Sequence, residues 1–245
     1  MKYKIIITAG GTSERIDNVR KITNSSTGKL GLTIANKLLE LKGEQINKIY
    51  YIAAKNSLKP SHEKIEVIEI GDTNELKMIV EKILATEKID YFVHSMAVSD
   101  YTVDFVTTAK RIVEAIENNK ELSLYDNIVD NSNAIIANKI SSYEDDLMIK
   151  LKRTPKIISL IKDLSPETFL VGFKLLDGVT KKELIDVATK LKDKNKCNLV
   201  VANDLSNIRM GKHLAYIIGD DKNYIEASGK EDIAEKLVSE MMGND

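Results

Sequence analysis

The sequence predicts an α/β fold in which a doubly wound, mostly parallel sheet carries an inserted arm or flap. Apolar runs of strand length alternate along the chain with segments whose apolar residues recur at helical spacing. Several of these runs are continuous, a pattern typical of parallel strands that are buried on both faces. A chain of 245 residues, 43% of them hydrophobic, can bury a substantial core. We therefore expect a single domain over residues 1–245.

The predicted elements follow one another as strands and helices in turn. The first strand covers residues 3–8, a β-branched run that stops at Gly10 and Gly11. The first helix covers residues 29–42, and Gly43 follows it as a stop signal. The other predicted strands cover residues 46–54, 64–70, 89–100, 168–174, 197–204 and 214–219, and the other predicted helices cover residues 73–88, 180–195 and 230–242. This order is typical of a Rossmann-like sheet with helices on both faces.

Residues 102–137 interrupt the alternation. The segment is mostly charged, polar or helical in pattern, and we expect no sheet strand in it. Excursions of this length inside compact domains are usually functional or mobile. We interpret the segment as an insertion that forms a flap or a dimer-contact arm.

Charge and cysteine content exclude several classes of protein. Lys and Arg (36) nearly balance Asp and Glu (37), so the net charge of −1 supplies no global field that would attract nucleic acid or an acidic membrane surface. The single cysteine, Cys197, excludes an internal disulfide and a multi-cysteine zinc site, and favours a reducing compartment. The opening apolar run is too short for a secretory leader or a membrane span. We expect a soluble, cytoplasmic protein.

Three predicted strands end in polar residues, at positions 9–15, 96–101 and 202–204. Ligands of open α/β sheets bind beyond such carboxyl ends. The first end lacks the third glycine of a dinucleotide-binding fingerprint, and no helix starts directly after it. A P-loop is excluded as well, because Thr23 stands where that motif needs glycine and Leu30 where it needs serine or threonine.

The segment from Asn24 to Gly28 permits two interpretations. The free N–H groups of a first helical turn, a glycine and several hydroxyls together form an anion site, which the helix dipole strengthens. In the other interpretation, Ser26 or Thr27 is an ordinary N-cap of the following helix. Spacing alone leaves both interpretations open.

Five segments carry a resemblance to a known family. In chain order they read ITAGGTSERIDNVRKITNSSTGKLG, AVSDY, NKISSYEDDLMIKLKRTPKII, LVGFK and LVVANDLS. The ordered set resembles the phosphopantothenate–cysteine ligase family of coenzyme A biosynthesis, over nearly the whole chain apart from the insertion and the last helix. In many bacteria this ligase is the C-terminal half of a fusion with a flavin-dependent decarboxylase. This chain begins at the first strand of the ligase and is therefore similar to the stand-alone form.

The resemblance implies a two-step reaction. The carboxylate of 4′-phosphopantothenate attacks the α-phosphorus of a nucleoside triphosphate, CTP in preference to ATP, and pyrophosphate leaves. The amine of L-cysteine then attacks the acyl nucleotide, phosphopantothenoyl-CMP, to give 4′-phosphopantothenoylcysteine and CMP. Mg²⁺ would arrive on the phosphate oxygens, without a metal cage from the protein. The resemblance also implies a homodimer with a shared active site, and it leaves the choice between CTP and ATP, and the association with a separate decarboxylase, open.

Several residues match the substrate side of the family's site. Asn24 matches the asparagine of the second step, whose neutral N–H donor can polarise the acyl carbonyl; the alternative is a turn asparagine. Arg20 matches an arginine that reaches the substrate across the dimer interface. Asp100 matches an aspartate near substrate and nucleotide, with N-capping as its alternative. The implied substrate site is completed by Ser26, Gly28, Met96 and Ala97, of which Met96 departs from the family's usual alanine.

Other residues match the nucleotide side. Lys139 matches the lysine that contacts the triphosphate, with Lys110 as a competing candidate. Thr154 and Pro155 stand where the family commonly has Asn-Pro, and Phe173 would lie by the base unless it is a core residue.

Lys190 and Lys194 can face one anion from one side of a helix, although they lie one position from the family's lysine pair, and a solvated charged face is the alternative. The implied nucleotide-binding residues are Gly10, Gly11, Asp100, Lys139, Thr154, Pro155, Phe173, Lys190 and Lys194, with Asn203 and Asp204 at the border of the site.

The three histidines, His62, His94 and His213, match no motif, and no chemistry is assigned to them. Two other classes of function stay open. A NAD(P)-dependent oxidoreductase would share the fold, but the absent fingerprint counts against it. A non-catalytic nucleotide-binding protein would keep Gly28 and lose the roles of Asn24 and Lys139.

Overall fold

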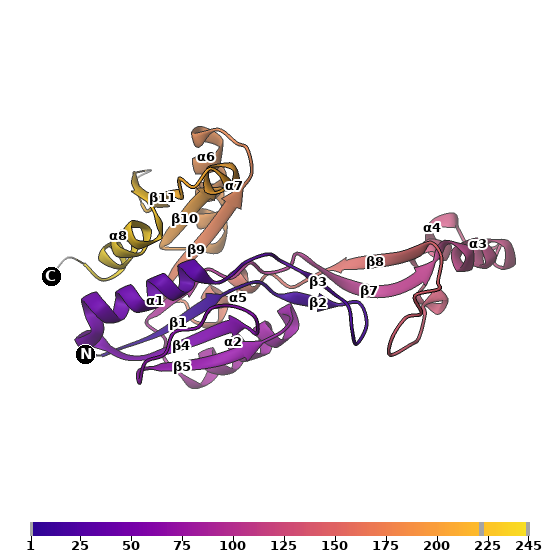
Figure 1. The fold of residues 1–245 in the computed structure, drawn as a ribbon, viewed down its shortest axis with the longest axis horizontal. Coiled ribbons are helices and arrows are strands. Elements are labelled where there is room, and N and C mark those ends of the chain that lie inside the picture. Colours follow the sequence, from indigo (N-terminus) through magenta and orange to yellow (C-terminus); the bar gives the residue numbers. More distant parts are fainter. Residues whose placement is uncertain (1, 221–222, 244–245) are drawn as a thin grey trace.

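The computed structural model describes residues 2–220 and 223–243 and confirms the predicted α/β fold (Figure 1). Its central sheet consists of β1 (Tyr3–Ala9), β4 (Ile46–Ala54), β5 (Ile65–Ile70), β6 (Tyr91–His94), β9 (Phe169–Leu176), β10 (Leu199–Asp204), β11 (Leu214–Ile218) and β12 (Tyr224–Ser228). The strands lie in the order β12-β11-β10-β9-β6-β1-β4-β5. All neighbours from β10 to β5 are parallel, and β11 and β12 add antiparallel pairs at one edge.

Helices cover both faces of the sheet. One face packs against α1 (Lys29–Lys42) and α8 (Lys230–Met242), and the other against α2 (Thr73–Thr86), α5 (Ile157–Leu164) and α6 (Lys181–Asn195). Successive residues of β1 point to opposite faces, so Ile5 and Ile7 enter the first core and Ile6 enters the second. The short helices η1 (Gly43–Gln45) and α7 (Leu205–Arg209) complete the body.

The strand order reverses direction between β1 and β6. From β1 the chain proceeds to β4 and β5 on one side, and from β6 to β9 and β10 on the other. In open α/β sheets, ligands bind at such a switch point, outside the carboxyl ends of the strands.

A long arm projects from the body (Figure 1). It is built from the antiparallel strands β7 (Tyr101–Thr108) and β8 (Leu147–Arg153), with α3 (Ala109–Asn118), α4 (Leu124–Val129) and η2 (Asn131–Asn133) between them. A hairpin of β2 (Ser13–Arg15) and β3 (Lys21–Thr23) leaves the body in the same direction, and β2 contacts β7.

The expectation that residues 102–137 contain no strand was wrong, because β7 lies in them. Its partner β8 is formed by residues 147–153, so the excursion returns to the body only after Arg153. Tyr101, Val103 and Phe105 alternate with the polar Thr102 and Asp104, but this run is short. The partner residues on β8 lie 39 to 52 positions later in the chain, so no local pattern reveals the pairing.

Other elements differ from the prediction in extent. α1 covers the predicted residues, whereas the strand expected over residues 89–100 ends at His94, and the polar residues after it leave the sheet. The short elements β2, β3, α5, α7 and β12 were not predicted.

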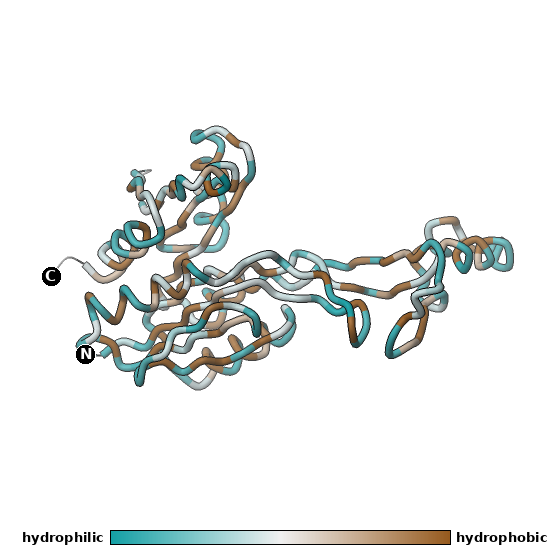
Figure 2. Tube along the Cα trace, in the orientation of Figure 1, coloured by the Kyte–Doolittle hydropathy of each residue, from teal (hydrophilic) through white to brown (hydrophobic). Residues whose placement is uncertain are grey.

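Hydrophobic residues follow the strands of the sheet and continue along the arm (Figure 2). On the arm several of them are exposed, among them Leu124, Tyr125, Ile136, Tyr143 and Met148. None of the helices in residues 2–220 and 223–243 combines the length and apolar character needed to cross a lipid bilayer.

Candidate functional site

A pocket of about 690 Å³ lies at the carboxyl ends of β6, β9 and β10, beside the switch point of the sheet. Its wall comes from the loop before α1, the loop after β6, the segment that follows the arm, the last turn of α6 and the first turn of α8. The predicted site residues that line it are Ser26, Gly28, Met96, Ala97, Asp100, Thr154, Pro155, Phe173 and Lys194, with Asn203 among the bordering residues. Residues from the whole length of the chain therefore converge at one place.

The loop before α1 ends in an uncapped helix N-terminus. Gly28 occupies the N-cap position with φ 73°, and no side chain caps the first turn. Capping by Ser26 or Thr27, one of the two interpretations that the sequence allowed, is therefore not what the structure shows. A Cβ atom on Gly28 would lie 3.2 Å from the backbone nitrogen of Gly10, so this close approach favours glycine. One position before the N-cap, the Thr27 hydroxyl accepts from the Lys29 N–H at 3.4 Å, and the N–H groups of Leu30 and Gly31 remain available to an anion.

Gly10 and Gly11 do not line the pocket; they support the loop that precedes α1. A Cβ atom on Gly11 would lie 2.2 Å from the carbonyl oxygen of Asn24, which leaves no room for a side chain. Gly10, at φ 88°, packs against Ser57 and Ala54 in the same way. The two glycines let the end of β1 pack closely under the loop that carries Asn24.

Asn24 lies beside the loop after β6, although it is not in the pocket lining. Its Nδ2 donates hydrogen bonds to the carbonyl oxygen of Ala97 at 3.0 Å and to Ser99 Oγ at 3.4 Å. Ser99 is itself held by Thr12, whose hydroxyl accepts from the Ser99 backbone N–H at 2.8 Å. The amide of Asn24 is thus positioned at the edge of the substrate-side loop.

Asp100 is the one carboxylate among the described residues that line the pocket. It forms an ion pair with Lys156, and both side chains are largely exposed. Thr154 is buried and donates from its hydroxyl to the carbonyl oxygen of Ser99, which ties the segment after the arm to the loop after β6. Met96 packs in the second core and also contributes to the pocket lining.

The pocket is strongly cationic. Five lysines line it, and only Lys156 is paired with the single carboxylate. The lysines are Lys29, Lys156, Lys174, Lys194 and Lys230. Of these, the sequence indicated only Lys194, because the others belong to no recognised spacing and meet only through the topology of the sheet. The facing helix residue Lys190 does not line the pocket.

Arg20 and Lys139 lie together on the hairpin and arm, and neither lines the pocket of its own chain. Asp17 accepts two hydrogen bonds from the Arg20 guanidinium, at 3.0 and 2.6 Å, and one from the Ile140 N–H at 3.1 Å. Arg20 also donates to the carbonyl oxygen of Ile140 at 2.9 Å. The guanidinium, followed by backbone N–H groups, holds the pKa of the Asp17 carboxyl well below its usual range.

Asn203 and Asp204 have different roles at the end of β10. Asn203 lines the pocket, while Asp204 accepts hydrogen bonds from Ser206 and from the backbone of Gly178 and Val179. The Ser206 hydroxyl and these N–H groups lower the pKa of Asp204 to about 2. Asp204 therefore fixes the loop between β9 and α6 and starts α7, beneath the site.

Two histidines to which the sequence assigned no role, His94 and His213, also line the pocket. The ammonium nitrogen of Lys230 lies 3.1 Å from Nε2 of His213. One feature of the sequence could have indicated that His94 belongs to the site: it lies at the end of a buried strand, two residues before Met96.

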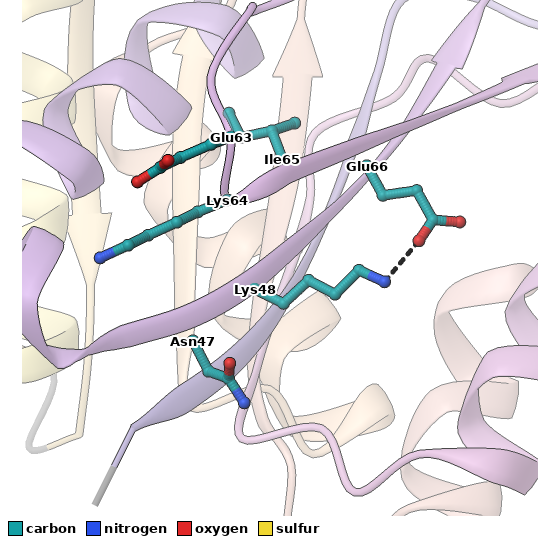
Figure 3. A pocket seen from close by; sticks show the side chains of 6 residues that line it. All are labelled: Asn47, Lys48, Glu63, Lys64, Ile65 and Glu66. Carbon is teal, nitrogen blue, oxygen red and sulfur yellow. Dashed lines mark ion pairs between the residues drawn. The ribbon is translucent and has the colours of Figure 1, made fainter.

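A second hollow, of about 440 Å³, lies on the opposite edge of the sheet, at the amino ends of β4 and β5 (Figure 3). It is lined by Asn47, Lys48, Glu63, Lys64, Ile65 and Glu66, with an ion pair between Lys48 and Glu66. None of the predicted site residues lies there. The described residues contain no group of three or more His, Cys, Asp or Glu side chains that could hold a metal ion.

Comparison with known proteins agrees with this fold. The model of the DNA/pantothenate metabolism flavoprotein C-terminal domain family matches residues 1–131 and 130–243. The coenzyme A biosynthesis bifunctional protein CoaBC of Thermococcus kodakarensis is 30% identical over 239 residues, which are 97% of this chain and 50% of that protein. CoaBC of Methanocaldococcus jannaschii is 26% identical over 240 residues, again 97% of this chain and 50% of the relative. The chain thus spans about half the length of the curated relatives it matches.

Two solved structures show the same fold. The DNA/pantothenate metabolism flavoprotein from Streptococcus pneumoniae has a TM-score of 0.82 and 37% identity, and the likeness covers 98% of both chains. A variant of Cab2 in complex with phosphopantothenate-cysteine has a TM-score of 0.70 and 17% identity, and covers 98% of this chain and 85% of that one. The chain therefore belongs to the DNA/pantothenate metabolism flavoprotein C-terminal domain family.

Proposed function

We propose that the protein is a ligase of coenzyme A biosynthesis that joins 4′-phosphopantothenate and L-cysteine through phosphopantothenoyl-CMP. The observation that carries the proposal is the pocket at the switch point, where five lysines face one carboxylate beside an uncapped helix N-terminus. Such a site suits a polyphosphate, because both lysine charges and free backbone N–H groups stabilise phosphate oxygens. Family membership and the phosphopantothenate-cysteine complex of Cab2 support the choice of substrates.

The first step is the activation of a carboxylate. A carboxylate oxygen of 4′-phosphopantothenate attacks the α-phosphorus of CTP, the bond to the β-phosphate breaks, and pyrophosphate leaves. Lysines such as Lys194 and Lys230, which line the pocket, offset the charge on the departing pyrophosphate. Mg²⁺ would enter on the triphosphate oxygens and add positive charge there; Asp100 is the pocket residue whose oxygens suit that ion.

The second step forms the amide. The amine of L-cysteine attacks the acyl carbon, the bond to CMP breaks with its electron pair on the CMP oxygen, and the nitrogen loses a proton. Asn24, whose Nδ2 reaches the carbonyl oxygen of Ala97 at the pocket edge, would donate to the acyl oxygen as charge develops on it.

The proposal includes a homodimer in which Arg20 and Lys139 serve the pocket of the partner chain. Their position on the hairpin and arm, outside the lining of their own pocket, supports this arrangement. Each pocket would then combine lysines of one chain with the arm of the other.

Release of pyrophosphate tests the proposal. Pyrophosphate should appear when 4′-phosphopantothenate and CTP are present without cysteine, since activation precedes amide formation, and ATP in place of CTP should release less. Lys194→Ala should slow the release, whereas Lys190→Ala, on the same helix but outside the pocket, is the matched control. Absence of pyrophosphate with every nucleoside triphosphate would show that the ligase assignment is wrong.

A further inference from the structure

His94 ends β6 and lines the pocket with only 8% of its surface exposed. Its Nδ1 lies 2.9 Å from the hydroxyl oxygen of Thr8, on the neighbouring strand β1. Nothing in the proposed reaction yet uses this side chain, although it stands two residues before Met96 in the loop that forms the substrate side of the pocket.

The hydrogen bonds of Thr8 decide which ring nitrogen of His94 carries the proton. Thr8 is fully buried, and its hydroxyl oxygen accepts from the backbone N–H of Met96 at 3.3 Å. Among the hydrogen bonds of the described residues, the one acceptor left for the hydroxyl proton is Nδ1 of His94. A buried hydroxyl proton without an acceptor is costly, so Thr8 donates to Nδ1.

The opposite ring nitrogen is therefore the donor. Burial lowers the pKa of His94 to about 4, so the imidazole is neutral near pH 7. A neutral ring that accepts at Nδ1 carries its proton on Nε2. In the described part of the chain no fully buried side-chain nitrogen lacks a hydrogen-bond partner, and Nε2 has none. This N–H must reach accessible space, which beside His94 is the pocket.

The neutral Nε2–H donor of His94 and the charged ammonium groups of the lysines suit different acceptor atoms of a ligand. The imidazole adds no charge for a phosphate, and it shares its face of the sheet with the apolar pocket residues Met96 and Ile157. A neutral carbonyl oxygen is the acceptor that fits an N–H donor among apolar groups.

We propose that His94, oriented by Thr8, is a specificity-determining residue whose Nε2–H donates a hydrogen bond to a neutral carbonyl oxygen of the bound ligand. The inference rests on the proposed function, whose ligands offer two sources of such an oxygen. The cytosine base has a ring carbonyl, which adenine lacks, and 4′-phosphopantothenate has an amide carbonyl.

The tautomer is tested directly in the wild-type chain. With ¹⁵N-labelled histidine, long-range proton–nitrogen correlation near pH 7 should show His94 neutral with its proton on Nε2. Thr8→Val removes the donor to Nδ1 and should produce a mixture of tautomers. A proton on Nδ1 in the wild-type protein overturns the inference, whatever the outcome of the pyrophosphate assay.

The ligand is tested by titration calorimetry with CTP, ATP and 4′-phosphopantothenate in separate experiments. His94→Phe keeps an aromatic ring and removes the donor, and should weaken binding of one ligand about three- to tenfold while the others change less than about twofold. A loss confined to CTP assigns the base carbonyl, and a loss confined to 4′-phosphopantothenate assigns the amide. His62→Phe, at an exposed histidine outside the pocket lining, should leave all three affinities as in the wild type.

Two results separate the failure of this inference from the failure of the proposed function. A wild-type chain that binds none of the three ligands overturns the proposed function. Wild-type binding with unchanged affinities in His94→Phe, or with equal losses for all three ligands, overturns only the role of His94. Should His94→Phe not fold, His94→Leu and the tautomer measurement apply the same test.

Discussion

Asn24 shows how one side chain can serve both the fold and the proposed chemistry. Its Nδ2 donates to the carbonyl oxygen of Ala97. Its backbone carbonyl oxygen lies 2.2 Å from the position that a Cβ atom on Gly11 would take. The same amide can turn to a ligand that enters beside Ala97 if the ligand replaces its hydrogen bonds to the Ala97 carbonyl and the Ser99 hydroxyl. The residue therefore belongs to a loop that is fixed by its backbone and adjustable at its side chain.

Asn24→Asp should separate the two steps of the proposed reaction. The carboxylate loses the donor and places negative charge beside the developing oxyanion, so amide formation should slow by about 10²–10³ while formation of the acyl nucleotide continues. Single-turnover measurement of both products decides this. Asn36→Asp, the same change on an exposed residue of α1, is the control. Equal slowing of both steps, or of neither, would leave Asn24 as a turn residue.

His94 also predicts a pH dependence of stability. Its pKa is 6.5 in an ordinary environment and about 4 in the folded chain, so the unfolded chain binds a proton first as the pH falls. Above pH 6.5 the neutral ring leaves the free energy of unfolding at its full value. Between pH 6.5 and about 4 that free energy falls by about 3 kcal/mol in all. Urea unfolding across this range should show the loss in the wild-type chain and a smaller one in His94→Gln. His62→Gln, at an exposed histidine, should behave as the wild type.

Among the elements, the arm depends most on long-range contacts. The strands β7 and β8 form a two-stranded sheet with no third strand, which is marginally stable alone. Asp17, in the turn of the β2–β3 hairpin, accepts from the Ile140 N–H on the arm and from Arg20 within the hairpin. This link places Arg20 beside Ile140, the residue that follows Lys139.

Asp17→Asn should loosen the arm without unfolding the body. The neutral amide cannot replace the charged Oδ2 that accepts from Arg20 Nε, Arg20 Nη2 and the Ile140 N–H, and an NH2 group at that position would face these donors. Hydrogen exchange of residues 138–140 should become faster, while exchange in β1 stays as in the wild type. Asp104→Asn, which removes ion pairs with Lys150 and Lys152 within the arm, is the control. Unchanged exchange at residues 138–140 would contradict the role of the Asp17 link.

In the whole molecule, the arm projects from the body, and hydrophobic residues continue along it (Figures 1 and 2). Ile136 and Tyr143 are 98% and 92% exposed. Exposed apolar groups on a projecting element are typical of a surface that is covered in an assembly. This favours the proposed homodimer with a shared site.

Mixed dimers test the shared site. Arg20→Ala and Asn24→Asp should each be inactive in product formation, but co-expression of the two chains should restore about a quarter of wild-type activity. Half of the dimers are then mixed, and in each mixed dimer one of the two sites carries both defects and the other carries neither. No restoration, with mixed dimers shown by two affinity tags, would place Arg20 in the site of its own chain.

The amino-acid sequence by itself determined the alternation of strands and helices and the glycine-rich, polar loops at the strand ends. These follow from side-chain periodicity and backbone freedom, which are properties of neighbouring residues: α1 agreed with its prediction from Lys29 to Lys42. Only the tertiary structure decided that Lys29, Lys156 and Lys230 meet in one pocket, that Asp17 joins hairpin and arm, and that Thr8 orients His94. Each of these depends on the order of parallel strands in the sheet, which brings together residues that no local pattern relates.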